Sequence, residues 1–457
     1  MSVIWYALWF IVAVSLLVTV HEFGHYWVAR RLGFKVLRFS VGFGKPLLSR
    51  VAGADRTEYV VAAIPLGGYV KLLDEREGPV PSADLPRAFT RKPPWQRILV
   101  LLAGPAFNIL FAILVLWGMF WWKGVSEAKP IVGDILRDSV AAHAGLRSGD
   151  EIKAINGVPV VGQRDVVFDL LDAMSSRGDA ALSVRGSDGS ARVATLRVPD
   201  SAERVRLTEP AELFHGLGFE FWAPPVPAVL GTVMADGPAA RAGLEAGDRI
   251  VAIQGAPVKD FRDIVAGIGS RPGATLDITY RRGGADHTVS VKVASEDGGD
   301  GKRVGRIKVM QPPVTLPDSI LLHTDFTLLG ALGRASEEAW DMTMMQGRLV
   351  ARMLTGHVSV KNLSGPLSIA QYAGESAAAG TASFLEFLVL ISLSLGFLNM
   401  LPIPILDGGQ IAFQAVEWLK GSPLSERAQA FGQQLGIALL ILLMGVALFN
   451  DIARQFS

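Results

Sequence analysis

The sequence of 457 residues contains no cysteine. Disulfide bonds, cysteine-ligated zinc and thiol catalysis are therefore excluded, although this absence does not fix the cellular compartment. Neither positive nor negative charge dominates, because the chain has 44 lysines and arginines and 43 acidic residues, which gives a formal net charge of +1. A chain so close to neutral gives no indication of nucleic-acid binding, and we expect no nucleic-acid partner.

Long hydrophobic runs are the most prominent feature that is present. Half of the residues are hydrophobic, and the mean hydropathy is positive. Four runs approach the length that crosses a bilayer, which predicts a polytopic α-helical membrane protein with four transmembrane helices. The runs are Val3–Val20, Ile98–Trp122, Phe384–Leu406 and Phe431–Phe449.

Basic residues beside the first two runs predict the orientation. Lysine and arginine concentrate on the cytoplasmic side of membrane proteins, so the 23–97 loop is expected in the cytoplasm. Four crossings then place 123–383 and both termini outside, and 407–430 inside. The basic residues are Arg30, Arg31, Lys35 and Arg38 after the first run, and Arg87, Arg91, Lys92 and Arg97 before the second.

The outer region contains an internal repeat. "AHAGLRSGDEIKAINGVPV" at 142–160 returns as "ARAGLEAGDRIVAIQGAPV" at 240–258. Each copy predicts a short helix ending at Ala-Gly-Leu, a Gly-Asp turn, and a strand leading into a turn at Asn156-Gly157 or Gln254-Gly255. Two units of this length indicate a tandem of small domains and not a solenoid.

The repeat resembles circularly permuted bacterial PDZ domains, which implies two PDZ-like α+β domains at 126–214 and 215–312. "GLGF" (Gly216, Leu217, Gly218 and Phe219) resembles the loop whose backbone amides hold a peptide carboxylate. We expect it to open the second domain, and we find no equally good loop for the first. The alternative, two spacers that bind no peptide, stays open.

Two further segments carry local patterns. Residues 34–74 alternate in strand fashion between glycine pairs, which predicts a small β-sheet at the cytoplasmic membrane face, within a region spanning 34–97. In the 313–383 linker, apolar residues at helical spacing over 325–354 predict an amphipathic helix.

The first run ends in a motif with catalytic chemistry. His21 and His25 are four residues apart, so on a helix both imidazoles can point at one place, with Glu22 beside it. This is the arrangement of zinc proteases, in which two neutral imidazoles hold the metal and the glutamate serves as general base. With 7 histidines in the chain, a chance match is improbable. The alternative is a pair of interfacial histidines at the end of a span.

A catalytic zinc site needs a third protein ligand. Asp407, in "GFLNMLPIPILDGGQ" at 396–410, follows the third run at its cytoplasmic end, level with His21. Pro402 and Pro404 prevent a regular helix there, although a plain Asp-Gly-Gly turn is the other interpretation. The remaining histidines lie outside in this topology and are His143, His215, His287, His323 and His357.

These motifs together resemble the site-2 protease family of intramembrane zinc metalloproteases, over essentially the whole chain. The paired PDZ-like domains resemble its branch that regulates envelope-stress sigma factors. The resemblance implies one zinc ion held by His21, His25 and Asp407, and Glu22 as the catalytic carboxylate. It implies substrate contacts by Asn399 and by an edge strand in "PLGGYVKLLD", namely Gly67, Gly68, Tyr69 and Val70.

The family resemblance also implies a division of the chain and a set of partners. The first helix with its motif spans 1–33, the second 98–122, the third segment 384–410 and the fourth 431–449. Expected partners are the lipid bilayer, single-span substrates of the anti-sigma-factor type and an upstream site-1 protease, in the bacterial inner membrane. "AGPAFNILFA" at 103–112 matches the second span of the family. The competing hypothesis is a catalytically inactive membrane-anchored PDZ scaffold.

Overall fold

The computed structural model describes residues 3–209, 212–297, 302–312, 316–422 and 424–456. The chain divides into two compact units. The first comprises 1–125, 204–210 and 323–452, and the second comprises 126–203, 211–322 and 453–457.

The first unit is mainly helical. Four of its described helices are long and apolar enough to cross a membrane, over Val3–Arg31, Pro94–Lys123, Thr381–Asn399 and Arg427–Arg454. The third ends at Asn399, earlier than the predicted Leu406, because Pro402 and Pro404 interrupt the helix as expected. The helices are α1 (Val3–Arg31), α2 (Pro94–Lys123), α9 (Leu328–Leu354), α10 (Pro366–Ala379), α11 (Thr381–Asn399), α12 (Asp407–Lys420) and α13 (Glu426–Phe456).

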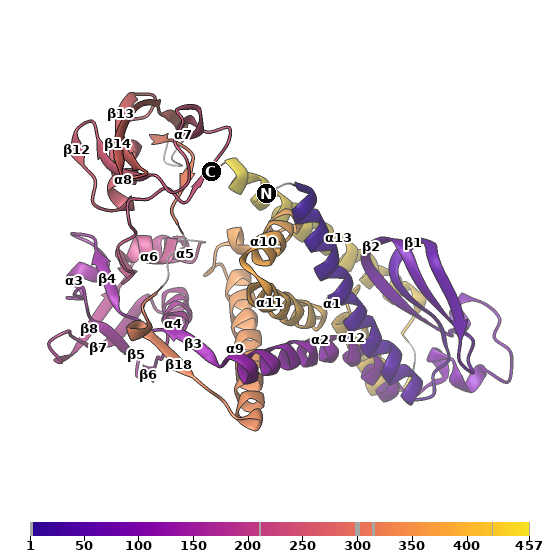
Figure 1. The fold of residues 1–457 in the computed structure, drawn as a ribbon. Coiled ribbons are helices and arrows are strands. Elements are labelled where there is room, and N and C mark those ends of the chain that lie inside the picture. Colours follow the sequence, from indigo (N-terminus) through magenta and orange to yellow (C-terminus); the bar gives the residue numbers. More distant parts are fainter. Residues whose placement is uncertain (1–2, 210–211, 298–301, 313–315, 423, 457) are drawn as a thin grey trace. The chain divides into compact units, whose positions relative to one another are not determined.

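Helices α1 and α2 pack side by side (Figure 1). Each buries a stripe of residues spaced by three or four, which places the stripe on one helix face. The two helices approach most closely at Gly24, where an added Cβ would lie 2.4 Å from the Ala103 carbonyl oxygen. The stripe of α1 is Ala13, Leu17, His21, Gly24, His25 and Ala29, and that of α2 includes Val100, Ala103, Gly104, Asn108, Ala112, Leu116 and Phe120.

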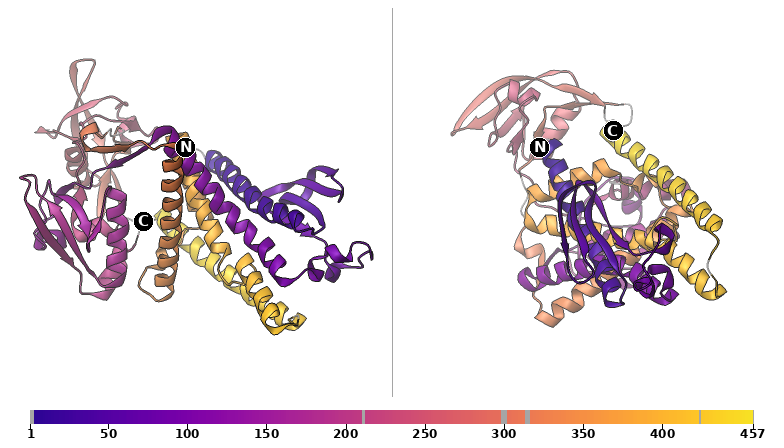
Figure 2. Two further views of the ribbon diagram at one scale, coloured as in Figure 1. Left: turned by 90° about the horizontal axis from the view of Figure 1, so that it is seen from below. Right: turned by 90° about the vertical axis from the view of Figure 1, so that its right-hand side faces the viewer.

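The predicted β-region forms a small sheet from β1 (Val36–Ala52) and β2 (Thr57–Leu72). Both strands bend, so that 36–43 pairs with 64–72 on one side and with 57–61 on the other, while 46–52 pairs with 57–62. Segments 64–72 and 46–52 are therefore the two edges. The sheet lies beside α1 in every view (Figures 1 and 2). Short 3₁₀ turns follow at Glu75–Glu77, Leu85–Arg87 and Phe89–Arg91.

The linker after the repeats contains the expected amphipathic helix, α9. Its buried apolar positions are all alanines, namely Ala331, Ala335 and Ala339, which pack against Leu116 and Phe120 of α2. The large apolar side chains that suggested the helix are instead partly exposed, with Trp340 at 63%. The pattern therefore predicted the helix correctly but not the residues that it buries.

The second unit contains two similar four-stranded sheets, in the orders β6-β5-β7-β8 and β12-β11-β13-β14. The turns predicted at Asn156-Gly157 and Gln254-Gly255 are present, with positive φ at all four residues. In the first copy the elements are α3 (Val140–His143), α4 (Gln163–Ser176), α6 (Glu212–Leu217), β3 (Val125–Ala128), β4 (Val132–Ile135), β5 (Glu151–Ile155), β6 (Val158–Pro159), β7 (Asp179–Arg185), β8 (Ala191–Arg197) and β9 (Phe219–Phe221). Helix α5 (Ser201–Leu207) follows β8 along the chain, and its residues from 204 onward belong to the first unit. In the second copy they are α7 (Pro238–Arg241), α8 (Phe261–Gly269), β10 (Thr232–Val233), β11 (Arg249–Ile253), β12 (Ala256–Pro257), β13 (Thr275–Arg282), β14 (Ala285–Lys292), β15 (Ala294–Asp297), β16 (Arg303–Arg306) and β17 (Val309–Met310), with β18 (Leu321–Thr324) following.

The structure corrects the position of GLGF and with it the boundary at 214/215. Strand β9, which begins at Phe219, pairs with β4 of the first copy, and Gly218 accepts a hydrogen bond from the Leu136 amide. The corresponding pair in the second copy joins β10 to β17, and the Lys308 carbonyl accepts from Met234. GLGF therefore closes the first domain and does not open the second. Because the permuted strand is contributed from the end of each repeat, sequence order alone was misleading.

Candidate metal centre

Helix α1 carries both histidines of the motif on its buried stripe. His21 and His25 are 8% and 9% exposed, and their Nε2 atoms lie 3.2 Å apart. The Nδ1 atom of His25 lies 2.7 Å from the backbone oxygen of Val100 on α2. A carbonyl only accepts hydrogen bonds, so the proton of His25 resides on Nδ1 and its Nε2 presents a lone pair.

The third polar group reaches the same place from the other end of the chain. Asp407 is the first residue of α12, and its Oδ2 lies 3.1 Å from His21 Nε2 and 3.4 Å from His25 Nε2. The two glycines after it are needed because the 400–404 loop folds back tightly over them. A Cβ on Gly408 or Gly409 would lie 2.3 or 2.2 Å from a backbone oxygen of that loop. The Asp-Gly-Gly sequence thus fixes the approach of the carboxylate.

The three groups fit a zinc ion. The described residues contain this one group of three candidate ligands, whose atoms lie within 4.8 Å of one another. Tetrahedral zinc with bonds of about 2.0–2.1 Å separates its ligand atoms by about 3.3 Å, close to the 3.1–3.4 Å observed here. Asp407 Oδ2 is buried without a hydrogen-bond partner among the described residues. Acceptor atoms converging in this way need a cation between them.

Glu22 lies beside the three candidate ligands and against the edge segment of β2. The backbone amide of Val70 faces its carboxylate, and a Cβ on Gly68 would lie 3.1 Å from Glu22 Cγ. Ser15, two turns earlier on α1, donates to the Pro65 carbonyl at 3.2 Å. The edge strand therefore runs along the face of α1 that carries the glutamate.

Space for the two imidazoles depends on Gly104 of α2. An added Cβ there would lie 2.4 Å from His25 Nε2 and 2.7 Å from His21 Cε1. Since both rings are already packed between α1 and α2, neither can move aside without leaving the position that faces Asp407.

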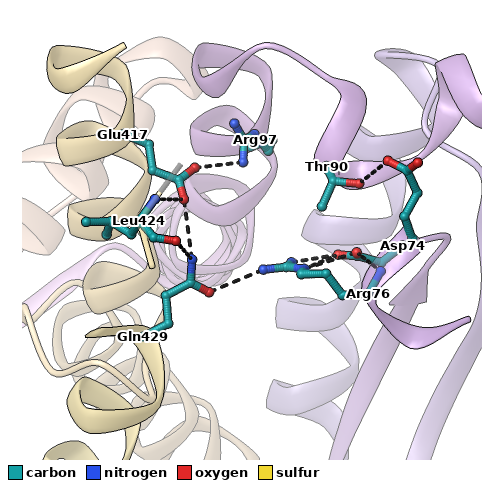
Figure 3. Close-up of polar contacts among 8 residues, drawn as sticks. Asp74, Arg76, Thr90, Arg97, Glu417, Leu424 and Gln429 are labelled. Atoms are coloured by element: carbon teal, nitrogen blue, oxygen red, sulfur yellow. Dashed lines mark hydrogen bonds and ion pairs between the residues drawn. The ribbon is translucent and has the colours of Figure 1, made fainter. Parts of the chain in front are cut away.

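The far end of α12 is held by a polar network around the buried Glu417 (Figure 3). Glu417, 7% exposed, accepts from Arg97 of α2 at 3.0 Å and from the Leu424 amide at 3.1 Å. Gln429 of α13 bridges Glu417 to Arg76. Burial raises the pKa of Asp74, but the hydrogen bonds from Arg76 outweigh this and lower it from its ordinary value. The network ties both ends of the turn between α12 and α13 to the start of α2.

The structure gives positions for the predicted substrate-contacting and peptide-binding residues, but their roles stay predictions. The Asn399 side-chain amide donates to the Leu395 carbonyl of its own helix at 3.1 Å. Gly67 has a φ of 155°, and a Cβ there would overlap the Phe43 ring. Tyr69 accepts a hydrogen bond from Arg38 at 2.9 Å. In GLGF, Leu217 and Phe219 are buried in the first domain.

Sequence reasoning missed Gly104, Asn108 and the Val100 carbonyl. Asn108 is fully buried on α2, and its Nδ2 lies 3.2 Å from His21 Nδ1. An amide inside an apolar run is unusual enough to mark a functional position, so the run itself contained the signal.

Comparisons with known proteins agree with this chemistry. The model of peptidase family M50 matches residues 9–443. A putative zinc metalloprotease of Neisseria meningitidis is 39% identical over 97% of this chain and 98% of its own length. Regulator of sigma-E protease RseP of Escherichia coli is 39% identical over 99% of this chain and its own full length. A solved PDZ domain of the SdrC-like protein of Listeria monocytogenes is 25% identical, with a TM-score of 0.17, and covers 20% of this chain and 92% of that one.

Proposed function

We propose that this chain, which belongs to peptidase family M50, is a zinc metalloendopeptidase of the site-2 type that cuts peptide bonds within membrane-spanning segments. The observation that carries the proposal is the convergence of His21, His25 and Asp407 within 4.8 Å, with Glu22 beside them. Three protein ligands leave a fourth position for water or substrate, as catalytic zinc requires. We assign one zinc ion to the chain.

Different residues of the site have different roles in the reaction. When bound, zinc polarises the scissile carbonyl and makes water more acidic. Glu22 removes a proton from the attacking water and later delivers it to the leaving amine. The Val70 amide, which faces Glu22, orients that carboxylate toward the ligands.

Edge segment 64–72 receives the substrate. A transmembrane helix hides its peptide bonds in internal hydrogen bonds, so it must unwind before a carbonyl reaches the site. Segment 64–72 has a partner strand on one side only, and it runs along the face of α1 that carries Glu22. An unwound substrate can pair with such an edge by β-augmentation. Gly67, Gly68, Tyr69 and Val70 contribute backbone contacts, and Asn399 contacts the substrate from the end of α11.

The relatives and the apolar helices support one class of substrate. The Escherichia coli relative is named a regulator of sigma-E protease. We assign to this chain single-span membrane proteins of the anti-sigma-factor type, cut after an upstream site-1 protease, with remnant signal peptides as a further class. The basic residues flanking the first two spans support a bacterial inner-membrane location with the metal site toward the cytoplasm and the PDZ-like domains in the periplasm.

The PDZ-like pair acts as a size gate. Two compact domains exclude a substrate with a bulky outer domain until another protease has trimmed it. The competing mechanism is a receptor, in which GLGF captures the new carboxyl terminus. Deleting 126–312 should let untrimmed substrate be cleaved if the pair is a gate, and should abolish cleavage of trimmed substrate if it is a receptor. The zinc content of the deletion variant is measured as a control, because it tells whether the metal site has survived the deletion.

Glu22→Gln tests the enzyme against the inactive scaffold. Detergent-solubilised wild type and variant are incubated with a panel of single-span substrates, and zinc is measured in both. We expect the variant to keep zinc and lose at least about a hundredfold in cleavage, the usual contribution of such a base. Cleavage above a tenth of wild type would contradict the role of Glu22, and wild-type protein that cuts no member of the panel would favour the scaffold.

A further inference from the structure

Asn108 is a buried amide with an unsatisfied acceptor. It is 0% exposed, its Nδ2 lies 3.2 Å from His21 Nδ1, and its Oδ1 is buried with no hydrogen-bond partner among the described residues. Its backbone oxygen accepts from Ser392 of α11 at 2.8 Å, so the residue is held between two helices. An unpaired amide oxygen buried among apolar helices costs free energy that a partner would recover.

The proton of His21 decides how this amide must be oriented. A zinc-ligating imidazole presents an unprotonated nitrogen, and His21 Nε2 is the atom that faces Asp407. Its proton therefore belongs on Nδ1, opposite the amide of Asn108. With Nδ2 facing Nδ1, two donors would oppose each other, whereas with Oδ1 there the imidazole proton has an acceptor. The oxygen and nitrogen of an amide have nearly the same shape, and the hydrogen-bond network decides between them.

We propose that Asn108 is a positioning residue of the metal site. Its Oδ1 accepts the proton of His21 Nδ1, which holds the imidazole in one tautomer with Nε2 free for zinc. The Val100 carbonyl does the same for His25 at 2.7 Å. Partners of this kind orient the ligating ring and raise its basicity. The inference rests on the proposed zinc site at His21, His25 and Asp407.

A purely structural role is the competing explanation, because Asn108 also lies in the contact between α2 and α11. A Cβ on Gly396 of α11 would lie 3.4 Å from Asn108 Cβ. Three substitutions separate the roles. Asn108→Leu keeps the branching at Cγ but removes the acceptor, Asn108→Asp keeps an acceptor, and Ser392→Ala removes only the bond to the Asn108 backbone.

The test is zinc affinity, measured by chelator competition on the full-length, metal-stripped protein in detergent. We expect Asn108→Leu to bind zinc about 10- to 100-fold more weakly, with Asn108→Asp at or above wild type and Ser392→Ala unchanged. Wild-type affinity in Asn108→Leu would overturn the inference. If that variant fails to fold, Asn108→Asp decides, because a loss of affinity there also overturns it.

His21→Ala keeps this outcome separate from the proposed function. Loss of zinc in His21→Ala with retention in Asn108→Leu removes only the role of Asn108. Retention in His21→Ala would instead mean that the metal site itself is wrongly assigned, whatever Asn108 does.

Discussion

Both units of this protein contain buried carboxylates, but the groups that surround these carboxylates differ. Asp150 and Asp248, each 1% exposed, sit at the Gly-Asp turn of the two repeats and accept a backbone N–H at 2.8 Å. Each also pairs with an arginine, Arg192 or Arg282. Asp407 Oδ2 is buried without such a donor and faces two imidazole nitrogens. A satisfied buried carboxylate stabilises a fold, whereas an unsatisfied one among acceptors marks a cation site.

The largest effect that this comparison predicts is loss of metal in Asp407→Ala. Removing one of the three proposed zinc ligands should sharply reduce zinc content, measured by elemental analysis of the purified chain. Asp248→Ala is the matched control, since its carboxylate is also buried but already satisfied, and its zinc content should equal that of wild type. Full zinc occupancy in Asp407→Ala, with another residue at the metal, would break the comparison.

Gly104→Ala tests whether packing keeps the imidazoles in place. The added methyl group would lie 2.4 Å from His25 Nε2, so at least one ring must leave its position. We expect zinc affinity to fall about a hundredfold, as when a supporting partner of a ligand is lost. Gly118→Ala, on the same helix, is the control, because an added Cβ there meets nothing within 4 Å. Equal affinity in the two variants would mean that the rings have room to move.

The sequence predicted the convergence of the three candidate ligands better than it predicted their surroundings. His21, Glu22 and His25 are contiguous on one helix, so their spacing alone indicates convergence. Predicting Asp407 required the four apolar runs, because only the predicted topology placed Asp407 at the same membrane depth as His21. Gly104 and Asn108 lie beside the two histidines only because α1 packs against α2, and that packing is set by tertiary contacts and not by any local motif.

In the repeats, the local turns were predicted correctly but the position of the candidate peptide-binding loop was not. Local turn chemistry predicted Asn156-Gly157 and Gln254-Gly255 correctly, since hairpin turns require positive φ. The position of GLGF was wrong because β9 returns to pair with β4, about 85 residues earlier in the chain. Non-local strand pairing of this kind leaves no signature in a window of neighbouring residues.

Val70→Pro tests the edge strand and is expected to have a smaller effect. Proline removes the amide that faces Glu22. Losing a hydrogen bond to a charged group costs about 1.5–3 kcal/mol, so cleavage should slow by roughly tenfold or more while zinc is retained. Leu48→Pro, on the opposite edge segment 46–52, is the control and should change cleavage much less. Equal rates in the two variants would argue against a special role for segment 64–72.

The smallest effect concerns the satisfied carboxylate itself. Burial raises the pKa of Asp248, but the hydrogen bonds from Arg282 and from the Glu245 amide outweigh it, and the pKa is lowered from its ordinary value. A group with a depressed folded-state pKa contributes stability above its unfolded pKa, about 3.9, and loses that contribution as pH falls through the folded value. Asp248→Asn should therefore be less stable at pH 7, by about 1–2 kcal/mol, and should lose less on acidification than wild type.

Hydrogen exchange in the full-length protein can measure this difference. Peptides covering β11 and β13 should exchange faster in Asp248→Asn than in wild type at neutral pH, and the two should converge as pH falls below about 4. Peptides from β5 and β7 of the other repeat serve as an internal control, because Asp150 and Arg192 are untouched. The same difference between variant and wild type at every pH would show that the carboxylate acts through its shape and not its charge. Asp248 would then be a packing residue, and the contrast with Asp407 would rest on the metal site alone.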